Sequence, residues 1–258
     1  MNKNYFFNLF NGEDEFVIAS VFEDISLCLD IDYPVYGRTF LPPQIASKLC
    51  EFCSSIGLQI KSFGLTENSE KKLIVFAPKE FDVNTLEPPI TYFKIDANNK
   101  FKNLQHKDFL GSIMSLGLRR ETLGDILVKD NIGYCVALTD IYNIIVSSLE
   151  GINTIPIKIK ELSISEIPEP EFKEFTDTIP SFRLDSIIAC IGNFSRNISV
   201  NLIESGDVLV NYSVEKSKSK NIEIGSVITI RKKGKFILEQ NLGENKKGKF
   251  KILIKQYI

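Results

Sequence analysis

Residues 181–230 read SFRLDSIIACIGNFSRNISVNLIESGDVLVNYSVEKSKSKNIEIGSVITI. Apolar residues at helical spacing predict one short helix in RLDSIIACI and a second in RNISVNLIES. Gly192-Asn193 ends the first helix, and Ser195 is a typical N-cap for the second. Gly206 ends the second helix, and two short strands follow around a lysine-rich loop. The stretch therefore predicts a helix pair packed on a small sheet.

The charge of the chain is uneven along its length. The net charge is −2, but residues 181–258 hold 14 Lys and Arg against 7 Asp and Glu. Residues 1–180 hold the other 17 basic and 26 acidic residues, so the C-terminal part carries +7 and the rest −9. A basic region on an acidic body indicates a polyanion-binding face, although a lysine-rich surface can also be simply solvated.

The cations of the C-terminal region fall on the outer side of the predicted helix pair and in lysine-rich loops. Arginine beside a helix N-terminus can bind phosphate through its planar fork. The structural alternatives are that Arg183 pairs with Asp185 and that Ser195 only caps its helix. The residues expected to bind a polyanion such as RNA here are Arg183, Ser195, Arg196, Asn201, Lys216, Lys218, Arg231, Lys232, Lys233, Lys235, Lys246 and Lys247.

This stretch resembles the S4 RNA-binding module. The shared residues are Arg183-Leu184-Asp185, Ser195-Arg196, Leu202-Ile203, Gly206, Val208-Leu209-Val210-Asn211 and Ile224-Gly225-x-Val227-Ile228. In that family the helix pair lies against structured RNA, and basic side chains contact phosphates. The departures from the family pattern are Ile198, Glu204, Asp207 and Ser226. The resemblance therefore implies RNA binding with weaker phosphate contacts than in typical members.

The middle of the chain follows a different pattern. Strands are predicted at 90–96, 124–128, 133–138 and 154–162, with helices at 106–118 and 139–151. This β-α-β-β-α-β order is that of ferredoxin-like domains and is shared by RNA-recognition modules. The two central strands offer Tyr92, Phe93 and Tyr134, which either stack on RNA bases or pack within the protein.

The predicted architecture is α+β with three folded parts. Residues 1–79 form a small N-terminal α/β unit, and residues 80–162 form a ferredoxin-like RNA-binding domain. Residues 163–180 contain three prolines and five acids against one lysine, which predicts a stiff acidic linker. Residues 181–258 form the S4 module with basic C-terminal hairpins.

The segment LQHKDFLGSIMSLGLRRETLGDIL (104–127) indicates a binding corner. Gly117 ends a helix, Arg119 and Arg120 follow at its exposed end, and His106 and Lys107 lie at its start. We expect His106, Lys107, Arg119 and Arg120 to contact phosphate, with a surface or capping role as the alternative for His106. Gly124 then permits a close approach of the backbone.

This segment, the S4-like module and Lys246-Lys247-Gly248 resemble the YlmH-type S4 proteins of bacteria. Phe40-Leu41-x-Pro43 and Glu70-Lys71-Lys72 also match. The resemblance implies a non-enzymatic protein whose middle domain also binds RNA. It further implies that the protein engages the large ribosomal subunit together with tRNA during rescue of stalled translation.

Composition argues against several other classes of protein. A single histidine and five scattered cysteines argue against multi-histidine metal sites, zinc fingers and disulfide frameworks. The C-x-x-C at Cys50 and Cys53 lies on a predicted helix over 43–56, where packing is a more common role than redox chemistry.

We expect no catalytic residue, no metal, no cofactor and no small-molecule substrate. The longest apolar runs are too short to cross a bilayer and no signal peptide is present, so we expect a cytoplasmic monomer with no membrane contact. Two alternatives stay open: an RNA-modifying enzyme with a site in the N-terminal body, and an adaptor linked to cell division.

Overall fold

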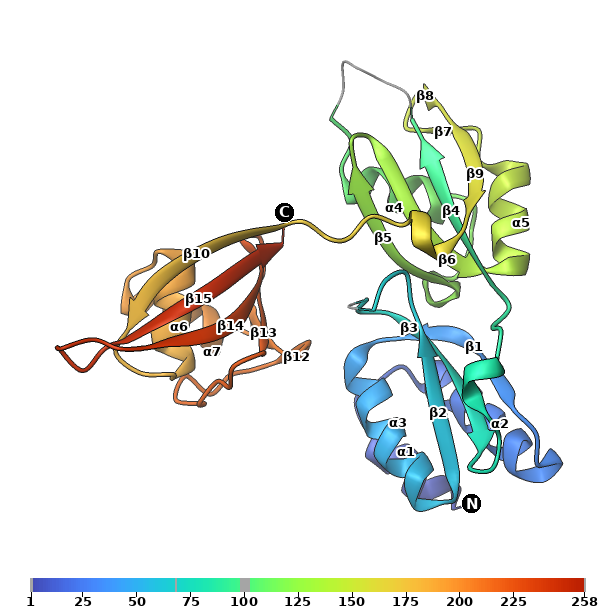
Figure 1. Ribbon diagram of the computed structural model, residues 1–258, viewed down its shortest axis with the longest axis horizontal. Coiled ribbons are helices and arrows are strands. Elements are labelled where there is room, and N and C mark those ends of the chain that lie inside the picture. The colour runs from blue at the N-terminus through green and yellow to red at the C-terminus, as the bar shows by residue number, and fades with distance from the viewer. Residues whose placement is uncertain (1, 68, 98–102, 258) are drawn as a thin grey trace. The chain divides into compact units, whose positions relative to one another are not determined.

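Helices and strands alternate along the computed structural model, which describes residues 2–67, 69–97 and 103–257. The chain divides into two compact units, Met1–Glu169 and Pro170–Ile258 (Figure 1). Both units combine helices with antiparallel sheets, so the predicted α+β class is confirmed. Within the described part of the chain, no helix combines the length and the apolar character that a membrane crossing requires.

The N-terminal part of the first unit packs helices on a three-stranded antiparallel sheet. Its elements are α1 (Lys3–Leu9), α2 (Glu15–Ile31), β1 (Val35–Leu41), α3 (Pro43–Ser55), β2 (Leu58–Phe63), β3 (Lys72–Pro78) and η1 (Val83–Thr85), with sheet order β1-β3-β2. Asp14 caps α2, since its carboxylate accepts hydrogen bonds from the N–H groups of Phe16 and Val17. Strand β1 forms one edge of this sheet.

The central part of the first unit keeps the predicted β-α-β-β-α-β order, with a short hairpin inserted before its last strand. Its elements are β4 (Ile90–Asp96), α4 (His106–Met114), η2 (Arg120–Thr122), β5 (Leu123–Lys129), β6 (Ile132–Leu138), α5 (Thr139–Ser148), β7 (Gly151–Ile152), β8 (Ile155–Pro156), β9 (Lys158–Leu162) and η3 (Ile164–Glu166). The four long strands pair in the order β5-β6-β4-β9. Helices α4 and α5 cover one face of this sheet, where Phe93, Phe109 and Ile145 are fully buried.

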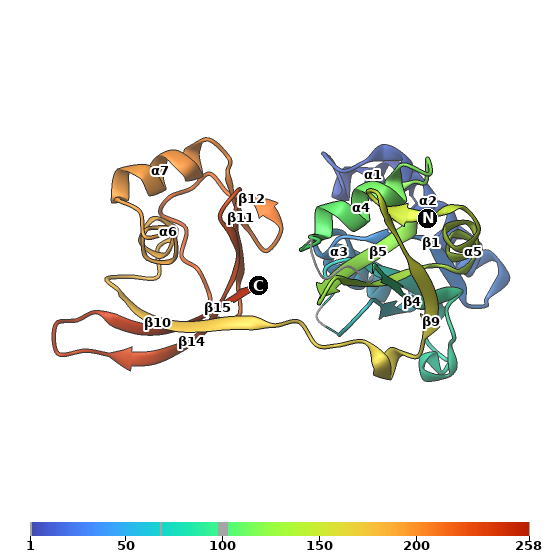
Figure 2. The ribbon, with the colours of Figure 1, turned by 90° about the horizontal axis from the view of Figure 1, so that it is seen from above.

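The second unit is built on one antiparallel sheet of strand order β10-β15-β14-β13-β11-β12. Its elements are β10 (Phe172–Ile179), α6 (Leu184–Gly192), α7 (Arg196–Glu204), β11 (Val208–Val210), β12 (Ser213–Val214), β13 (Val227–Ile230), β14 (Gly234–Glu244) and β15 (Phe250–Tyr257). Figure 2 shows both helices on the same side of this sheet. Buried side chains of both helices and the sheet form its core.

The predicted linker over 163–180 is wrong for its second half. Residues 172–179 form β10, which pairs with β15 along its whole length. Ile179 is fully buried and the rings of Phe172 and Tyr257 meet edge to face with their centres 4.8 Å apart, so apolar residues hold the strand in place. The acids of β10 lie on an edge strand, where charged side chains discourage further pairing.

Candidate nucleic-acid interface

A buried carboxylate joins the two arginines of the S4-like motif. Asp185 is 1% exposed and lies at the start of α6. Arg183 donates through Nε to Oδ1 at 3.0 Å and through Nη2 to Oδ2 at 3.1 Å. Arg196, at the start of α7, donates through Nη2 to the same Oδ2 at 3.1 Å. The two Nη2 atoms therefore lie at most about twice that distance apart.

These contacts also decide the ionisation of Asp185. Burial acts to raise the pKa of Asp185, but hydrogen bonds from Arg183 and Arg196 outweigh it and hold the pKa below its usual value. The carboxylate is therefore ionised at neutral pH and keeps both guanidinium groups in place. The side chain of Arg183 is 39% exposed and that of Arg196 is 72% exposed, so both can still donate to a ligand.

The lysine-rich loop after β12 is fixed against the start of α6. The N–H groups of Leu184 and Asp185 donate to the carbonyl oxygens of Lys220 and Lys218 at 2.9 and 3.1 Å. The N–H groups in the first turn of α6 thus already have acceptors within the protein. Helix α7 also begins beside an arginine. There Ser195 accepts a hydrogen bond from the N–H of Ile198 and acts as the predicted N-cap.

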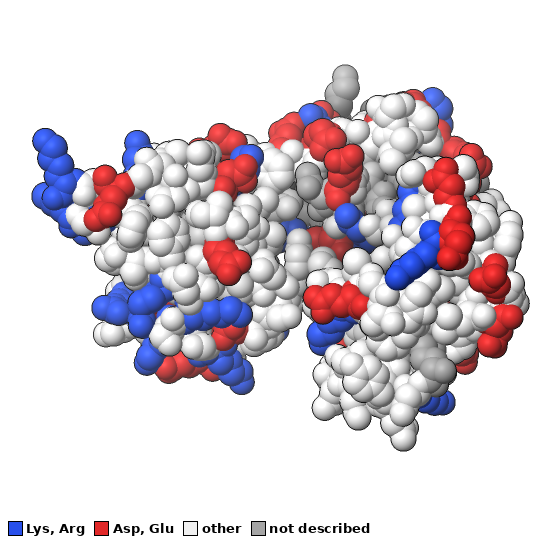
Figure 3. All heavy atoms as spheres, turned by 60° about the horizontal axis from the view of Figure 1, so that its bottom comes forward, with Lys and Arg blue, Asp and Glu red and all other residues white. Residues whose placement is uncertain are grey.

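Acidic side chains moderate this basic surface. Lys218 pairs with Glu204 at 3.2 Å, and Arg231 lies 3.9 Å from Asp207. Both acids are among the departures from the S4 pattern, so these departures form ion pairs with cations that were predicted to bind RNA. Lys216 is exposed, and its Cε would lie 3.7 Å from a Cβ placed on Gly206. Figure 3 shows Lys and Arg gathered on one side of the second unit and at its projecting end.

The other predicted residues of the second unit occupy three kinds of position. Asn201 is exposed on α7, and Lys232 lies in the β13–β14 turn with a φ of 65°. Lys233 lies in the same turn, with its Nζ 5.7 Å from the centre of the Phe194 ring. Lys246 and Lys247 are exposed at the tip of the β14–β15 hairpin, which extends beyond the rest of the sheet (Figure 1).

Lys235 does not belong to a basic loop. It lies in β14, half-buried, with its Nζ 3.9 Å from the ring centre of Tyr257 and 5.7 Å from that of Tyr212. Burial lowers the pKa of Lys235 to about 8. A lysine held over aromatic rings contributes to packing, so Lys235 has a structural role in β14 in addition to any contact with RNA.

The segment 104–127 mainly connects the central part of the first unit to its N-terminal part, and we call this contact the internal joint. Gly124 lies in β5, where a Cβ would come within 3.0 Å of Phe40 in β1. Asp125 accepts hydrogen bonds from the N–H groups of Glu70 and Lys71 at 2.6 and 3.3 Å. The matched residues of the N-terminal third, Phe40 and Glu70-Lys71, therefore meet the middle motif directly.

Arg120 belongs to this joint and not to the surface predicted for it. It is partly buried, and its Nη1 donates to the carbonyl oxygens of Leu123 and Gly124. Burial lowers the pKa of Arg120, against the effect of the carboxylates of Asp125 and Glu121. Its guanidinium thus holds the backbone at the start of β5.

The other three residues of the segment that were expected to contact phosphate are exposed. Arg119 pairs with Glu121 at 3.6 Å, and Lys107 lies in the first turn of α4. His106 precedes it. Partial desolvation of its imidazole lowers the pKa of His106, and the positive charge of the nearby Arg120 lowers it further. Asp108 closes the start of α4 by accepting from the N–H of Gln105 at 2.8 Å. His106, Lys107 and Arg119 are thus exposed, whereas Arg120 is partly buried.

The three aromatic residues of the central strands separate into different environments. Phe93 is fully buried and packs against Tyr142, with the two ring centres 5.1 Å apart. Tyr92 packs against Phe40 and Leu73 of the N-terminal part, and its hydroxyl donates to the carbonyl of Gly64 at 3.2 Å. Tyr134 alone among the three lies outside both packed cores, and it is partly exposed.

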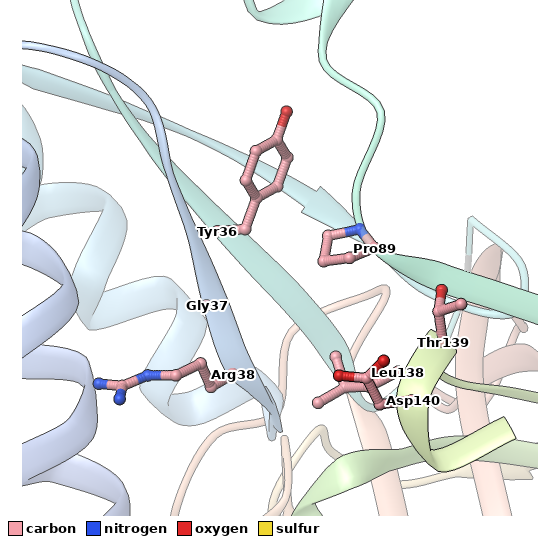
Figure 4. A pocket seen from close by; sticks show the side chains of 7 residues that line it. All are labelled: Tyr36, Gly37, Arg38, Pro89, Leu138, Thr139 and Asp140. Carbon is pink, nitrogen blue, oxygen red and sulfur yellow. The ribbon is translucent and has the colours of Figure 1, made fainter. Parts of the chain in front are cut away.

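A small cleft in the first unit offers little chemistry. It measures about 190 Å³. Its lining, drawn in Figure 4, consists of Tyr36, Gly37, Arg38, Pro89, Leu138, Thr139 and Asp140. The guanidinium of Arg38 points towards α2, where it pairs with Asp24 at 2.9 Å and Glu23 at 3.2 Å. Asp140 is then the only carboxylate in the lining, so we assign no reaction to this cleft.

Three comparisons with known proteins agree with this description. Residues 85–166 match the family model described as "Putative RNA-binding domain in YlmH". The Ribosome-associated protein quality control protein P2 of Bacillus subtilis (strain 168) is 24% identical over 215 residues, which cover 83% of this chain and 84% of that protein. The solved structure of cell division protein ylmH from Streptococcus pneumoniae matches with a TM-score of 0.52 and 25% identity, over 62% of this chain and 96% of that one.

The first of these matches shows that the central domain is similar to the domain of YlmH that carries this description. The three matches together confirm the resemblance to YlmH-type proteins that the sequence indicates.

Proposed function

We propose that this chain is a non-enzymatic, cytoplasmic RNA-binding protein that acts on the ribosome. The observation that carries the proposal is the arginine pair on Asp185, bordered by the lysine loop 216–220. Two guanidinium groups held on one buried carboxylate present their remaining N–H groups without further loss of side-chain freedom. Phosphate oxygens match such donors in charge and geometry.

The ribosomal setting rests on the relatives. The Bacillus subtilis protein is named for ribosome-associated quality control, which supports a role in rescue of stalled translation. We place the contact on structured rRNA or tRNA of the large subunit, bound by a monomer through the ferredoxin-like domain and the S4 module. In this proposal the second unit supplies the main phosphate contacts, because its net charge is positive while that of residues 1–180 is negative.

Sedimentation of a cell lysate on sucrose gradients tests the proposal. At about 50 mM salt the protein should migrate with the large ribosomal subunit, and at about 200 mM it should move to the top, because counterion release weakens phosphate contacts steeply. Arg183→Ala with Arg196→Ala should release the protein at lower salt. Lys3→Ala with Lys79→Ala removes the same charge from exposed sites on the first unit and should leave migration unchanged.

Binding of purified RNA gives the matching quantity. Each arginine that contacts one phosphate should contribute roughly 0.9 to the slope of log affinity against log salt, so the double variant should lose nearly two units of slope. Wild-type migration and slope in the arginine variant would refute the S4-face proposal. A protein that remains at the top of the gradient at both salt concentrations would favour the adaptor alternative.

A further inference from the structure

The face of the central sheet that α4 and α5 do not cover has two halves. Antiparallel pairing places Val136 of β6, Tyr92 of β4 and Leu162 of β9 in one row. Tyr92 and Val136 pack with Phe40 and Leu73 from the N-terminal part, so this half is an internal contact of the first unit. The half towards the β5–β6 turn carries a different set of side chains.

That second half combines one aromatic ring with lysines. Register places Leu127, Tyr134, Lys94 and Lys160 in one row, on β5, β6, β4 and β9 in turn. Directly opposed residues in antiparallel strands have Cβ atoms about 4.5–5.5 Å apart, so Lys94 has Tyr134 on one side and Lys160 on the other. Tyr134 and Lys94 are partly exposed and Lys160 is exposed. Lys158, one row further along β9, is exposed as well.

The charges in this row are not balanced within the row itself. Lys94 and Lys160 oppose each other directly, and like charges in that arrangement destabilise a sheet. Glu166 of η3 is an acidic neighbour, since both lysines act to lower its pKa after the larger effect of hydrogen bonds from Ser163. Asp96 lies in the next row, opposite Lys158. A phosphate placed between Lys94 and Lys160 would attract both ammonium groups and so offset their mutual repulsion.

We propose that this half of the sheet, Tyr134 with Lys94 and Lys160, binds single-stranded RNA by stacking one base on Tyr134 and holding flanking phosphates on the lysines. A flat sheet accepts a base on an aromatic ring only when the base is unpaired, which excludes the interior of a duplex. The inference rests on the proposed RNA-binding function and extends it to a second, chemically distinct site in the first unit.

The test uses the full chain and a single-stranded decauridylate that carries 2-aminopurine at one position. Stacking of the 2-aminopurine on a tyrosine quenches its fluorescence, which reports the base contact directly. Tyr134→Leu should weaken binding about tenfold and abolish the quenching, while Tyr134→Phe keeps the ring and should retain both. Lys94→Gln with Lys160→Gln should lower the salt slope by roughly 1.4, because each single-strand phosphate contact contributes about 0.7.

A charge-matched control separates this site from non-specific attraction. Lys3→Gln with Lys79→Gln should leave both oligonucleotide binding and the quenching unchanged. Equal affinity and quenching for wild type and Tyr134→Leu would overturn the inference. Binding of structured RNA without any binding of the oligonucleotide would overturn it too, while the proposed function would stand. If the wild-type protein binds neither structured RNA nor the oligonucleotide, the proposed function itself is refuted.

Discussion

Gly124→Ala tests whether the middle motif is an internal joint. A Cβ at this position would lie 2.5 Å from Cγ1 of Val136 and 3.0 Å from Cε1 of Phe40. Both neighbours are essentially inaccessible to solvent, at 0% and 1% exposed, so neither can move outwards easily. Adding a methyl group to such a packed site costs about 1–3 kcal/mol, and we expect the first unit to lose stability by this amount.

The same substitution at Gly111 is the matched control. Gly111 lies within α4, and a Cβ there would meet no atom within 4 Å. Alanine is favoured over glycine inside a helix by about 0.5–1 kcal/mol, so Gly111→Ala should stabilise the protein. The same glycine-to-alanine change is thus expected to lower stability at position 124 and to raise it at position 111, although both positions lie in the segment 104–127.

Urea unfolding of the full chain, followed by circular dichroism, measures both effects. Hydrogen exchange of peptides from β5 and β6 assigns the change to the first unit. The Gly124 variant should unfold at lower urea and exchange faster in β5, and the Gly111 variant should do neither. The joint would be refuted if Gly124→Ala unfolds at or above the wild-type midpoint.

Three further predictions concern single carboxylates and thiols. Burial raises the pKa of Asp24 to about 6, against the effect of Arg38, so the folded state binds this proton more tightly than the unfolded state does. That contribution to stability is complete below pH 4 and lost as pH rises through 6; relative to wild type, Asp24→Asn should gain about 3 kcal/mol between pH 4 and pH 8, measured by urea unfolding. Asp185→Asn should weaken RNA binding in the wild-type background but not when Arg183 and Arg196 are already alanine, and equal losses in both backgrounds would show that Asp185 does not act through the arginines. Cys50 is exposed, whereas burial raises the pKa of Cys53 to about 12, so Cys50→Ser should remove the fastest phase of maleimide labelling, while a fast phase that persists would contradict this assignment.

Local elements of the fold were predictable because their signals are local. Apolar periodicity located α3 and the two helices of the second unit, and β4 has the predicted bounds. Ser195 caps α7 as expected, since an N-cap depends on a residue only three positions away. Strand β10 was missed because its partner β15 lies more than 70 residues later in the chain. Prolines and acids beside it resemble a linker when that partner is not known.

The candidate site shows the same division. The sequence located the arginines, but the hydrogen bonds that join Arg183 and Arg196 through Asp185 connect the starts of two different helices. Lys94 and Lys160 were not singled out, because their adjacency arises only when β4 pairs with β9. Each lysine by itself is indistinguishable from a solvated surface charge.

Arg119 and Arg120 show where sequence information ends. Composition, periodicity and motifs are properties of the chain, so the α+β class, the family resemblance and the excess of cations in the C-terminal part could be inferred before the structure was known. The fold was needed to show that Arg119 faces solvent while Arg120 turns inward to the carbonyls of Leu123 and Gly124. A partly buried guanidinium needs acceptors in place of water, and the packing of η2 and β5 against β1 creates this position and the acceptors around it.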